Sequence, residues 1–214
     1  MKNFNPLLYF ITDSTNFSEK EFLFHIEEAI LGGITLLQLR EKDKSTRQYI
    51  SLAKKVHTVA KKYSVPLIID DRIDVALAIG AEGVHLGQSD MPISIARKIL
   101  GENFIIGATA KTVEQATEAY KQGADYLGVG AIYPTTTKVK TVLTSTDTLR
   151  SICKAVPIPI NAIGGLNKNN IGILNGIGID GICAVSAIIK ADNPRMAAKE
   201  LKSATVRLLG GISK

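Results

Sequence analysis

The sequence predicts an α/β fold, a single (β/α)8 TIM barrel domain over residues 1–214, from three observations. Short β-branched runs alternate with helical patterns along the chain, at a repeat of roughly 26 residues that fits one strand, one helix and two short loops. Most of these runs are apolar throughout, as expected for strands covered on both faces. Glycine recurs between helix and strand, where it supplies the left-handed helix end of a short loop. An open doubly wound sheet is the alternative, but its first turn is usually glycine-rich, whereas residues 12–16 contain no glycine.

The elements follow from this pattern in chain order. The apolar, β-branched runs predict eight strands, at Leu7–Thr12, Leu36–Leu39, Pro66–Ile69, Gly83–Leu86, Phe104–Ala108, Tyr126–Gly130, Ile158–Ile163 and Gly181–Val185. Helical spacing between them is clearest at Lys20–Leu31, Thr46–Tyr63, Val113–Gln122 and Pro194–Leu208. The glycines expected to end a helix before the next strand are Gly33, Gly80, Gly123 and Gly178.

Composition excludes several classes of protein. The chain is 45% hydrophobic and 21% charged, which excludes a disordered, collagen-like or coiled-coil protein. No apolar run reaches the ~18 residues that a membrane helix needs, and residues 1–6 show no signal peptide. Cys153 and Cys183 lie too far apart for a CxxC site. We therefore expect reduced thiols and a cytoplasmic location.

The positive charge favours acidic ligands. The formal net charge of +6 fits nucleic acid, anionic lipid or phosphorylated substrates. The basic residues are scattered over helical faces, and the chain has no Trp and only 6% aromatic residues for stacking on bases. We therefore expect small phosphorylated substrates, with neither nucleic acid nor a membrane as a partner. The oligomeric state stays open.

Functional residues of a TIM barrel lie at the C-terminal ends of its strands, so those ends are searched in order. The second strand leads into Gln38, Arg40 and Lys42, whose spacing of two places them on one side of an extended segment. Two cations and an amide suit a phosphorylated ligand that also forms hydrogen bonds. Ion pairs with Glu41 and Asp43 are the alternative.

Carboxylates follow the next two strands. Asp70 and Asp71 follow the third strand and Asp90 follows the fourth, so Asp71 and Asp90 can approach each other. Hard carboxylate oxygens together with phosphate oxygens form a Mg²⁺ site. The alternatives are a helix cap for Asp71 and a plain turn for Asp90.

The ends of the fifth and sixth strands carry hydroxyl groups. Thr109 follows the fifth strand and can offer a hydroxyl to a ligand. The loop after the sixth strand places three threonines, residues 135–137, before Lys138, a pattern typical of a phosphate clamp that folds over a substrate. A plain polar loop is the alternative for this segment.

The last two strands give the most specific physical signal. Gly164 and Gly165 follow the seventh strand, and a short helix begins near Ser186 after the eighth. Many barrels bind a phosphate here through backbone N–H groups and a helix N-terminus. Histidines give no comparable signal, because His25 and His57 lie in expected helices. We expect His85, within the fourth strand, to serve packing.

Taken together, these motifs resemble the thiamine phosphate synthase family over nearly the whole chain. The specific segments are 38–42 (QLREK), 71–76 (DRIDVA), 83–90 (GVHLGQSD), 134–138 (PTTTK) and 163–165 (IGG). The resemblance implies a TIM barrel enzyme that joins 4-amino-5-hydroxymethyl-2-methylpyrimidine diphosphate to a thiazole phosphate, giving thiamine phosphate and pyrophosphate. In this family the reaction is dissociative: pyrophosphate leaves, a pyrimidine cation forms, and the thiazole nitrogen attacks it.

The resemblance also implies a role for each matching residue. Asp71 and Asp90 hold the Mg²⁺ cofactor, and Arg40, Lys42 and Lys138 are catalytic residues that grip the pyrophosphate. The implied substrate-binding residues are Gln38, Leu39, Arg40, Glu41, Lys42, Asp70, Thr109, Thr135, Thr136, Thr137, Lys138, Gly165, Val185 and Ser186. Within this set, Gln38 and Thr109 address the pyrimidine. The thiazole phosphate falls to Thr135, Thr137, Gly165, Val185 and Ser186.

The chain departs from the family pattern at two positions. Asp70 stands where the family usually has Asn, so an extra carboxylate near pyrophosphate needs an offsetting charge from the metal or Arg40. Thr109 stands where the family often has Ser, and the hydroxyl is kept. The thiazole tautomerase branch of the fold is a rival, but it uses a histidine after the fifth strand, where this chain has Ala110 and Lys111. A non-catalytic sensor of a phosphorylated ligand is the second rival.

Overall fold

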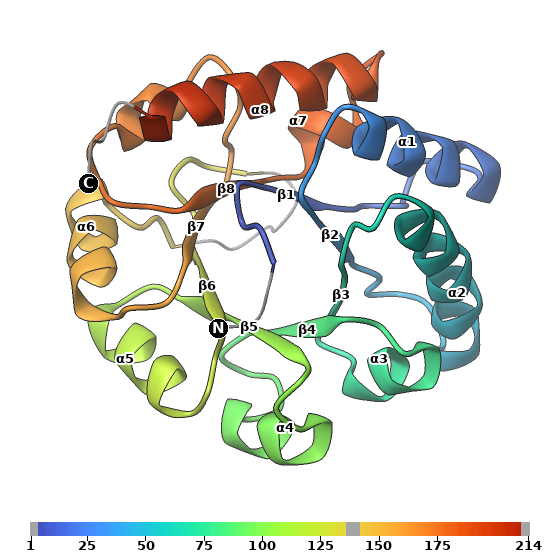
Figure 1. The fold of residues 1–214 in the computed structure, drawn as a ribbon, viewed down its shortest axis with the longest axis horizontal. Coiled ribbons are helices and arrows are strands. Elements are labelled where there is room, and N and C mark those ends of the chain that lie inside the picture. The colour runs from blue at the N-terminus through green and yellow to red at the C-terminus, as the bar shows by residue number, and fades with distance from the viewer. Residues whose placement is uncertain (1–3, 136–141, 211–214) are drawn as a thin grey trace.

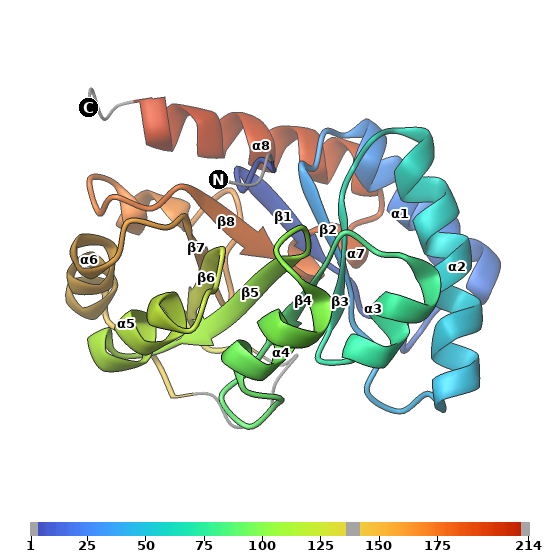
Figure 2. The same ribbon diagram turned by 60° about the horizontal axis from the view of Figure 1, so that its bottom comes forward.

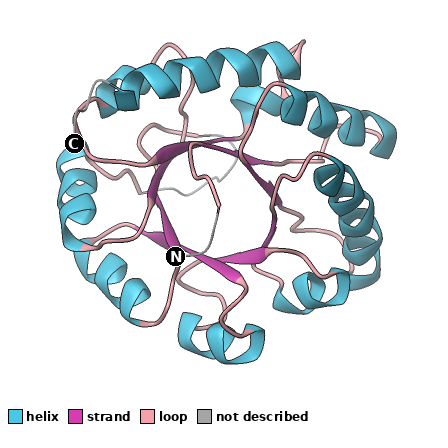
Figure 3. Ribbon diagram, in the orientation of Figure 1, coloured by secondary structure: helices cyan, strands magenta, loops and turns pink. Residues whose placement is uncertain are grey.

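The structure is a computed structural model that describes residues 4–135 and 142–210, and it confirms the (β/α)8 TIM barrel. Eight parallel strands pair in sequence order, and the last strand pairs with the first to close the ring. The helices lie outside this ring (Figure 3). Figure 1 looks down the barrel and shows the strands following one another around it.

The helices and strands begin and end close to the expected residues. The strands are β1 Leu8–Ile11, β2 Leu36–Leu39, β3 Leu67–Asp70, β4 Gly83–Leu86, β5 Ile105–Ala110, β6 Tyr126–Gly130, β7 Ile160–Ile163 and β8 Gly181–Ala184. The helices are α1 Glu19–Leu31, α2 Thr46–Lys62, α3 Ile73–Ile79, α4 Ile93–Leu100, α5 Val113–Lys121, α6 Thr146–Ala155, the 3-10 helix η1 Ile171–Leu174, α7 Ser186–Ile189 and α8 Pro194–Gly210.

Local sequence explains where the helices begin and end. Ser18 and Ser45 start α1 and α2 with capping boxes, in which the serine hydroxyl and the third helical residue satisfy each other's backbone N–H groups. The four glycines expected between helix and strand all have positive φ: +98° at Gly33, +65° at Gly80, +97° at Gly123 and +101° at Gly178. Short loops of this kind return each helix to the N-terminal end of the next strand.

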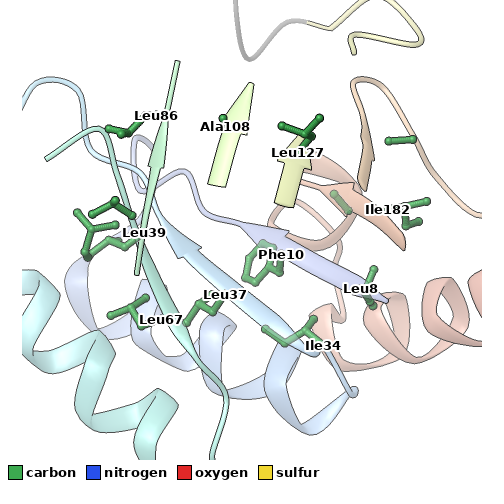
Figure 4. Packing of buried hydrophobic residues seen from close by; sticks show 14 of the residues in the cluster. Leu8, Phe10, Ile34, Leu37, Leu39, Leu67, Leu86, Ala108, Leu127 and Ile182 are labelled. Atoms are coloured by element: carbon green, nitrogen blue, oxygen red, sulfur yellow. The ribbon is translucent and has the colours of Figure 1, made fainter. Parts of the chain in front are cut away.

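Two buried layers separate the inside of the barrel from its helical coat. The larger cluster lies between strands and helices and includes Phe10, Leu37 and Leu39, as Figure 4 shows. The smaller cluster fills the barrel itself and consists of Tyr9, Ile11, Leu36, Ile68, Ile105, Tyr126 and Cys183. Side chains alternate between the layers because successive strand residues point to opposite faces. Gln38 and Arg40 therefore share the inward side with Leu36.

The C-terminal helix α8 completes the coat. It lies along α1 beside β1 and β8, where the ring closes (Figure 2).

None of the helices in the described residues has the length and apolar content that crossing a membrane requires. Cys153 is half-buried, Cys183 is buried, and both are free thiols.

Candidate active site

A cavity of about 170 Å³ lies inside the barrel at the C-terminal ends of the strands. It collects residues that are far apart in the sequence. The predicted site residues that line it are Gln38, Arg40, Asp70, Thr109, Thr135, Gly165, Val185 and Ser186. The barrel therefore brings the residues assigned to the pyrimidine and the residues assigned to the thiazole phosphate to one space.

Within residues 4–135 and 142–210, five residues of the predicted set do not line the cavity: Lys42, Asp71, Asp90, Leu39 and Glu41. Leu39 is fully buried in the layer between the barrel and the helices. The Glu41 carboxylate accepts a hydrogen bond from the Ser14 hydroxyl at 2.8 Å and lies 3.3 Å from the Lys44 ammonium. Both alternate with the inward residues Gln38 and Arg40, so their side chains leave the strand on the other side.

Lys42 pairs with the two carboxylates at the end of β3. Its ammonium lies 2.5 Å from Asp70 Oδ2 and also contacts Asp71 Oδ2. Arg40 Nε lies 3.9 Å from the same Asp70 oxygen. The offset that Asp70 requires therefore comes chiefly from Lys42. These are also different partners from Glu41 and Asp43, which were the alternative for this cluster.

Burial is the largest single influence on the pKa values of Asp70 and Lys42, and the hydrogen bonds between them are the next. Burial raises the pKa of Asp70 above its ordinary value, and the hydrogen bond from Lys42 opposes that rise. Burial would lower the pKa of Lys42, but its hydrogen bonds to Asp70 and Asp71 raise it overall. Lys42 is therefore a firmly held ammonium group beside the cavity.

The two predicted metal ligands lie at the ends of neighbouring strands, β3 and β4. Asp71 has φ +50°, and its backbone N–H donates to the His85 carbonyl at 2.9 Å. Asp90 closes a turn, because its Oδ2 accepts from the Gly87 N–H at 2.6 Å and its own N–H donates to the Gly87 carbonyl at 3.2 Å. Residues 4–135 and 142–210 contain no group of three or more acidic, His or Cys side chains that could hold a metal ion.

The loop after β7 brings bare backbone to the cavity. Gly164 has φ +102° and Gly165 has φ +63°. A Cβ atom added at Gly165 would lie 2.7 Å from Tyr133 Cβ and 2.9 Å from the Pro134 carbonyl oxygen, so no side chain fits there. After the neighbouring strand β8, α7 begins at the exposed Ser186, which also lines the cavity. This is the glycine pair and helix start that the sequence predicted.

The sequence reasoning missed part of the polar interior. Gln38 Nε2 donates to Tyr9 Oη at 2.6 Å, and Tyr9 Oη lies 2.8 Å from Tyr126 Oη. His85 Nδ1 lies 3.1 Å from Tyr126 Oη, and His85 Nε2 lies 2.9 Å from Thr109 Oγ1. His85 therefore does more than pack, because it lines the cavity itself and links the lining residue Thr109 to the buried Tyr126. The available signal was strand alternation, which places both tyrosines on the inward side of β1 and β6.

Part of the predicted phosphate clamp lies outside the described residues. Thr135 is described and lines the cavity. Thr136, Thr137 and Lys138 fall within residues 136–141, so their predicted contacts to substrate stay predictions.

Known proteins resemble this chain over nearly its whole length. The family described as thiamine monophosphate synthase matches residues 8–188. The thiamine-phosphate synthase of Clostridium tetani is 48% identical over 200 residues, covering 94% of this chain and 96% of that protein. The thiamine-phosphate synthase of Methanobrevibacter smithii is 48% identical over 201 residues, with the same coverage of 94% and 96%.

Solved structures show the same relation. Thiamine phosphate pyrophosphorylase from Pyrococcus furiosus has a TM-score of 0.87 and 40% identity, covering 95% of this chain and 97% of that chain. A 3-hexulose-6-phosphate synthase, at 19% identity and a TM-score of 0.68, shares the fold alone. The match over residues 8–188, together with relatives of nearly equal length, places this chain in the thiamine monophosphate synthase family of enzymes.

Proposed function

We propose that the protein condenses 4-amino-5-hydroxymethyl-2-methylpyrimidine diphosphate with a thiazole phosphate, giving thiamine phosphate and pyrophosphate. The observation that carries this proposal is the shared cavity, which Gln38, Arg40 and Thr109 line together with Gly165 and Ser186. An amide and a hydroxyl suit a pyrimidine, while glycine backbone and a helix start suit a phosphate. Two ligands held in one cavity react as if at a very high local concentration.

The chemistry asks little of a general base. The bond between the pyrimidine methylene carbon and the diphosphate oxygen breaks, and its electron pair leaves with the diphosphate. The thiazole nitrogen then supplies the electron pair of the new C–N bond and has no proton to lose. Arg40 and Lys42 stabilise the charge that develops on the leaving group, and Lys138 joins them. Lys42 has to exchange Asp70 and Asp71 for the diphosphate as it does so.

Magnesium at Asp71 and Asp90 is part of the proposal. The charges of Arg40 and Lys42 are balanced by those of Asp70 and Asp71, so a diphosphate needs further positive charge. Mg²⁺ binds through one or two carboxylates together with phosphate oxygens and water, which fits two carboxylates at the ends of adjacent strands. When bound, the ion would neutralise charge on the leaving diphosphate.

The second substrate takes the opposite part of the cavity. Its phosphate is proposed to meet the backbone at Gly165 and Val185 and the hydroxyl of Ser186, with threonines 135–137 folding against it. Leu39 and Glu41 can contact a substrate through their backbone atoms, since their side chains point elsewhere.

The proposed partners are these two phosphorylated molecules, with neither nucleic acid nor a membrane. The free thiols fit a cytoplasmic location.

A drop-out assay tests the proposal against both rivals. The purified protein is incubated with Mg²⁺ and both substrates, and thiamine phosphate is measured by its fluorescence after oxidation to thiochrome. We expect product only when both substrates are present. Isomerisation of a thiazole precursor without the pyrimidine would favour the tautomerase. Tight binding of either substrate without any product would favour the sensor.

A further inference from the structure

A chain of hydrogen bonds crosses the barrel interior, and each group in it donates to the next. Its members, which we call the polar row, are Gln38, Tyr9, Tyr126, His85 and Thr109. We propose that the polar row presets the cavity, so that Gln38 meets a ligand as an acceptor and Thr109 meets it as a donor. Tyr9, Tyr126 and His85 are then positioning residues that select a 4-aminopyrimidine over its 4-oxo analogue. This inference rests on the proposed function, because it refines how the first substrate is recognised.

The direction is set at the Gln38 end. An amide nitrogen donates hydrogen bonds and does not accept them, so Tyr9 Oη accepts the bond from Gln38 Nε2 at 2.6 Å. The Tyr9 proton then goes to its other polar neighbour, Tyr126 Oη, at 2.8 Å. Burial raises the pKa of both phenols well above the ordinary value, so each keeps its proton. Tyr126, having accepted, donates to His85.

His85 passes the direction on to Thr109. Its Nδ1, 3.1 Å from Tyr126 Oη, accepts and therefore carries no proton. Its Nε2 then carries the proton of a neutral imidazole and donates to Thr109 Oγ1 at 2.9 Å. The Thr109 hydroxyl has used a lone pair and keeps its own proton for the cavity. At the other end, the carbonyl oxygen of Gln38 remains as an acceptor.

With the Gln38 amide nitrogen facing Tyr9, the opposite direction fails at Tyr9. If Thr109 donated to His85 and His85 donated to Tyr126, the Tyr126 proton would also point at the Tyr9 oxygen. Tyr9 would then accept twice, and its own proton would have no acceptor among the side chains of the described residues. Tyr9 is fully buried, and an unsatisfied buried donor costs about 1–3 kcal/mol.

Two strand glycines make room for the rings of the polar row. A Cβ atom at Gly107 would lie 2.0 Å from Tyr126 Cζ, and a Cβ atom at Gly128 would lie 3.2 Å from His85 Cε1. Glycine inside a strand weakens the strand and often marks a close approach. Here it lets a phenol and an imidazole fill the interior of the barrel, where neighbouring strands hold them before a ligand arrives.

The two ends of the polar row, the Gln38 carbonyl oxygen and the Thr109 hydroxyl, match a 4-aminopyrimidine. A 4-aminopyrimidine offers amino N–H donors and ring nitrogens that only accept, so it meets Gln38 as donor and Thr109 as acceptor. The 4-oxo analogue has a carbonyl acceptor and a protonated ring nitrogen in their place. A site built to hydrogen-bond one pattern rejects the other because its polar groups are left unpaired, and we expect at least a ~100-fold preference.

The tautomer of His85 gives a direct test that needs no turnover. The protein is labelled with nitrogen-15 in its three histidine rings, and the His85 signals are assigned by their loss in His85→Gln. We expect Nε2 protonated and Nδ1 unprotonated at neutral pH. Tyr126→Phe, which removes the donor to Nδ1, should shift the balance toward Nδ1–H. The matched control Tyr49→Phe removes a buried hydroxyl that donates to the Leu39 carbonyl at 2.7 Å and should change nothing at His85. A protonated Nδ1 in the native protein overturns the proposal.

Binding of the two pyrimidine diphosphates, measured separately by calorimetry without the thiazole, gives the second readout. We expect the native ratio of affinities, amino over oxo, to fall at least ~10-fold in Tyr126→Phe and to persist in Tyr49→Phe. An unchanged ratio in Tyr126→Phe contradicts the polar row; if that variant does not fold, Tyr9→Phe replaces it. A protein with the expected tautomer and preference but no thiamine phosphate contradicts only the proposed function. A protein that makes thiamine phosphate with the other tautomer contradicts only the inference.

Discussion

Replacing Gly165 by alanine tests whether the loop after β7 holds the thiazole phosphate. Gly165 has φ +63°, a conformation that costs an L-residue about 1–2 kcal/mol. The added methyl group would also lie 2.7 Å from Tyr133 Cβ and 2.9 Å from the Pro134 carbonyl oxygen. Either this loop or residues 133–134 must therefore move, at a further cost of about 1–3 kcal/mol.

Gly80→Ala is the matched control, because it has the backbone strain of Gly165→Ala without the crowding around the added methyl group. Gly80 has φ +65°, almost the same conformation, and a Cβ atom there would meet nothing within 4 Å. It lies between α3 and β4, at the end of the barrel away from the cavity. The control carries only the conformational cost, so crowding accounts for a difference of about 1–3 kcal/mol between the two variants. Because the loop relieves this crowding by moving, and has to return to its native position to bind the phosphate, we expect a loss on the order of 5- to 150-fold in affinity.

The assay titrates each substrate separately by calorimetry and measures the free energy of unfolding in urea. We expect Gly165→Ala to weaken the thiazole phosphate by an amount in this range and to affect the pyrimidine diphosphate far less. Gly80→Ala should lose stability while binding both substrates normally. Equal losses for the two substrates in Gly165→Ala, or unchanged binding of the thiazole phosphate, would refute the assignment of this loop.

Three further predictions concern other parts of the chain. Asp71→Ala or Asp90→Ala should slow turnover at least ~100-fold while the barrel stays folded, and full activity of either variant or in excess chelator would remove the metal assignment. Lys138→Ala should raise the barrier in single-turnover kinetics by about 2–4 kcal/mol, whereas Lys140→Ala should not, and equal near-native rates would exclude Lys138 from the chemistry. Burial raises the pKa of the Cys153 thiol from 9.0 to about 11, so less of it is present as the reactive thiolate at pH 8. Its alkylation by iodoacetamide at pH 8 should therefore run about 100-fold slower than that of an ordinary cysteine, and it should speed up as the pH rises toward this pKa. A rate like that of free cysteine would contradict this burial.

The barrel could be predicted because its signals are local. Apolar runs of four to six residues, and glycines such as Gly33 and Gly80 at the helix ends, each report their own position in the repeat. Strand ends then identify the catalytic face, because parallel strands in a closed barrel all end on the same side. Gln38, Arg40 and Thr109 were found in this way without any knowledge of their contacts.

The pairing of these residues could not be predicted, because it depends on how far each side chain reaches across the barrel. Lys42 forms ion pairs with Asp70 and Asp71 at the end of the next strand. It does not pair with its sequence neighbour Glu41, because strand alternation turns the Glu41 side chain outward, where it accepts a hydrogen bond from Ser14. The contact between Tyr9 and Tyr126 joins residues 117 positions apart. It also depends on the space left by Gly107, which no local pattern reveals.

Stoichiometry measured by phosphorus NMR tests the condensation most directly. Both substrates and Mg²⁺ are mixed with the protein, and the signals of pyrophosphate and thiamine phosphate are followed together as the substrates disappear. If the cavity binds the two substrates side by side and joins them, one pyrophosphate appears for each thiamine phosphate, and neither appears when one substrate is left out. Pyrophosphate released without thiamine phosphate would make the protein a hydrolase and would contradict the proposed condensation.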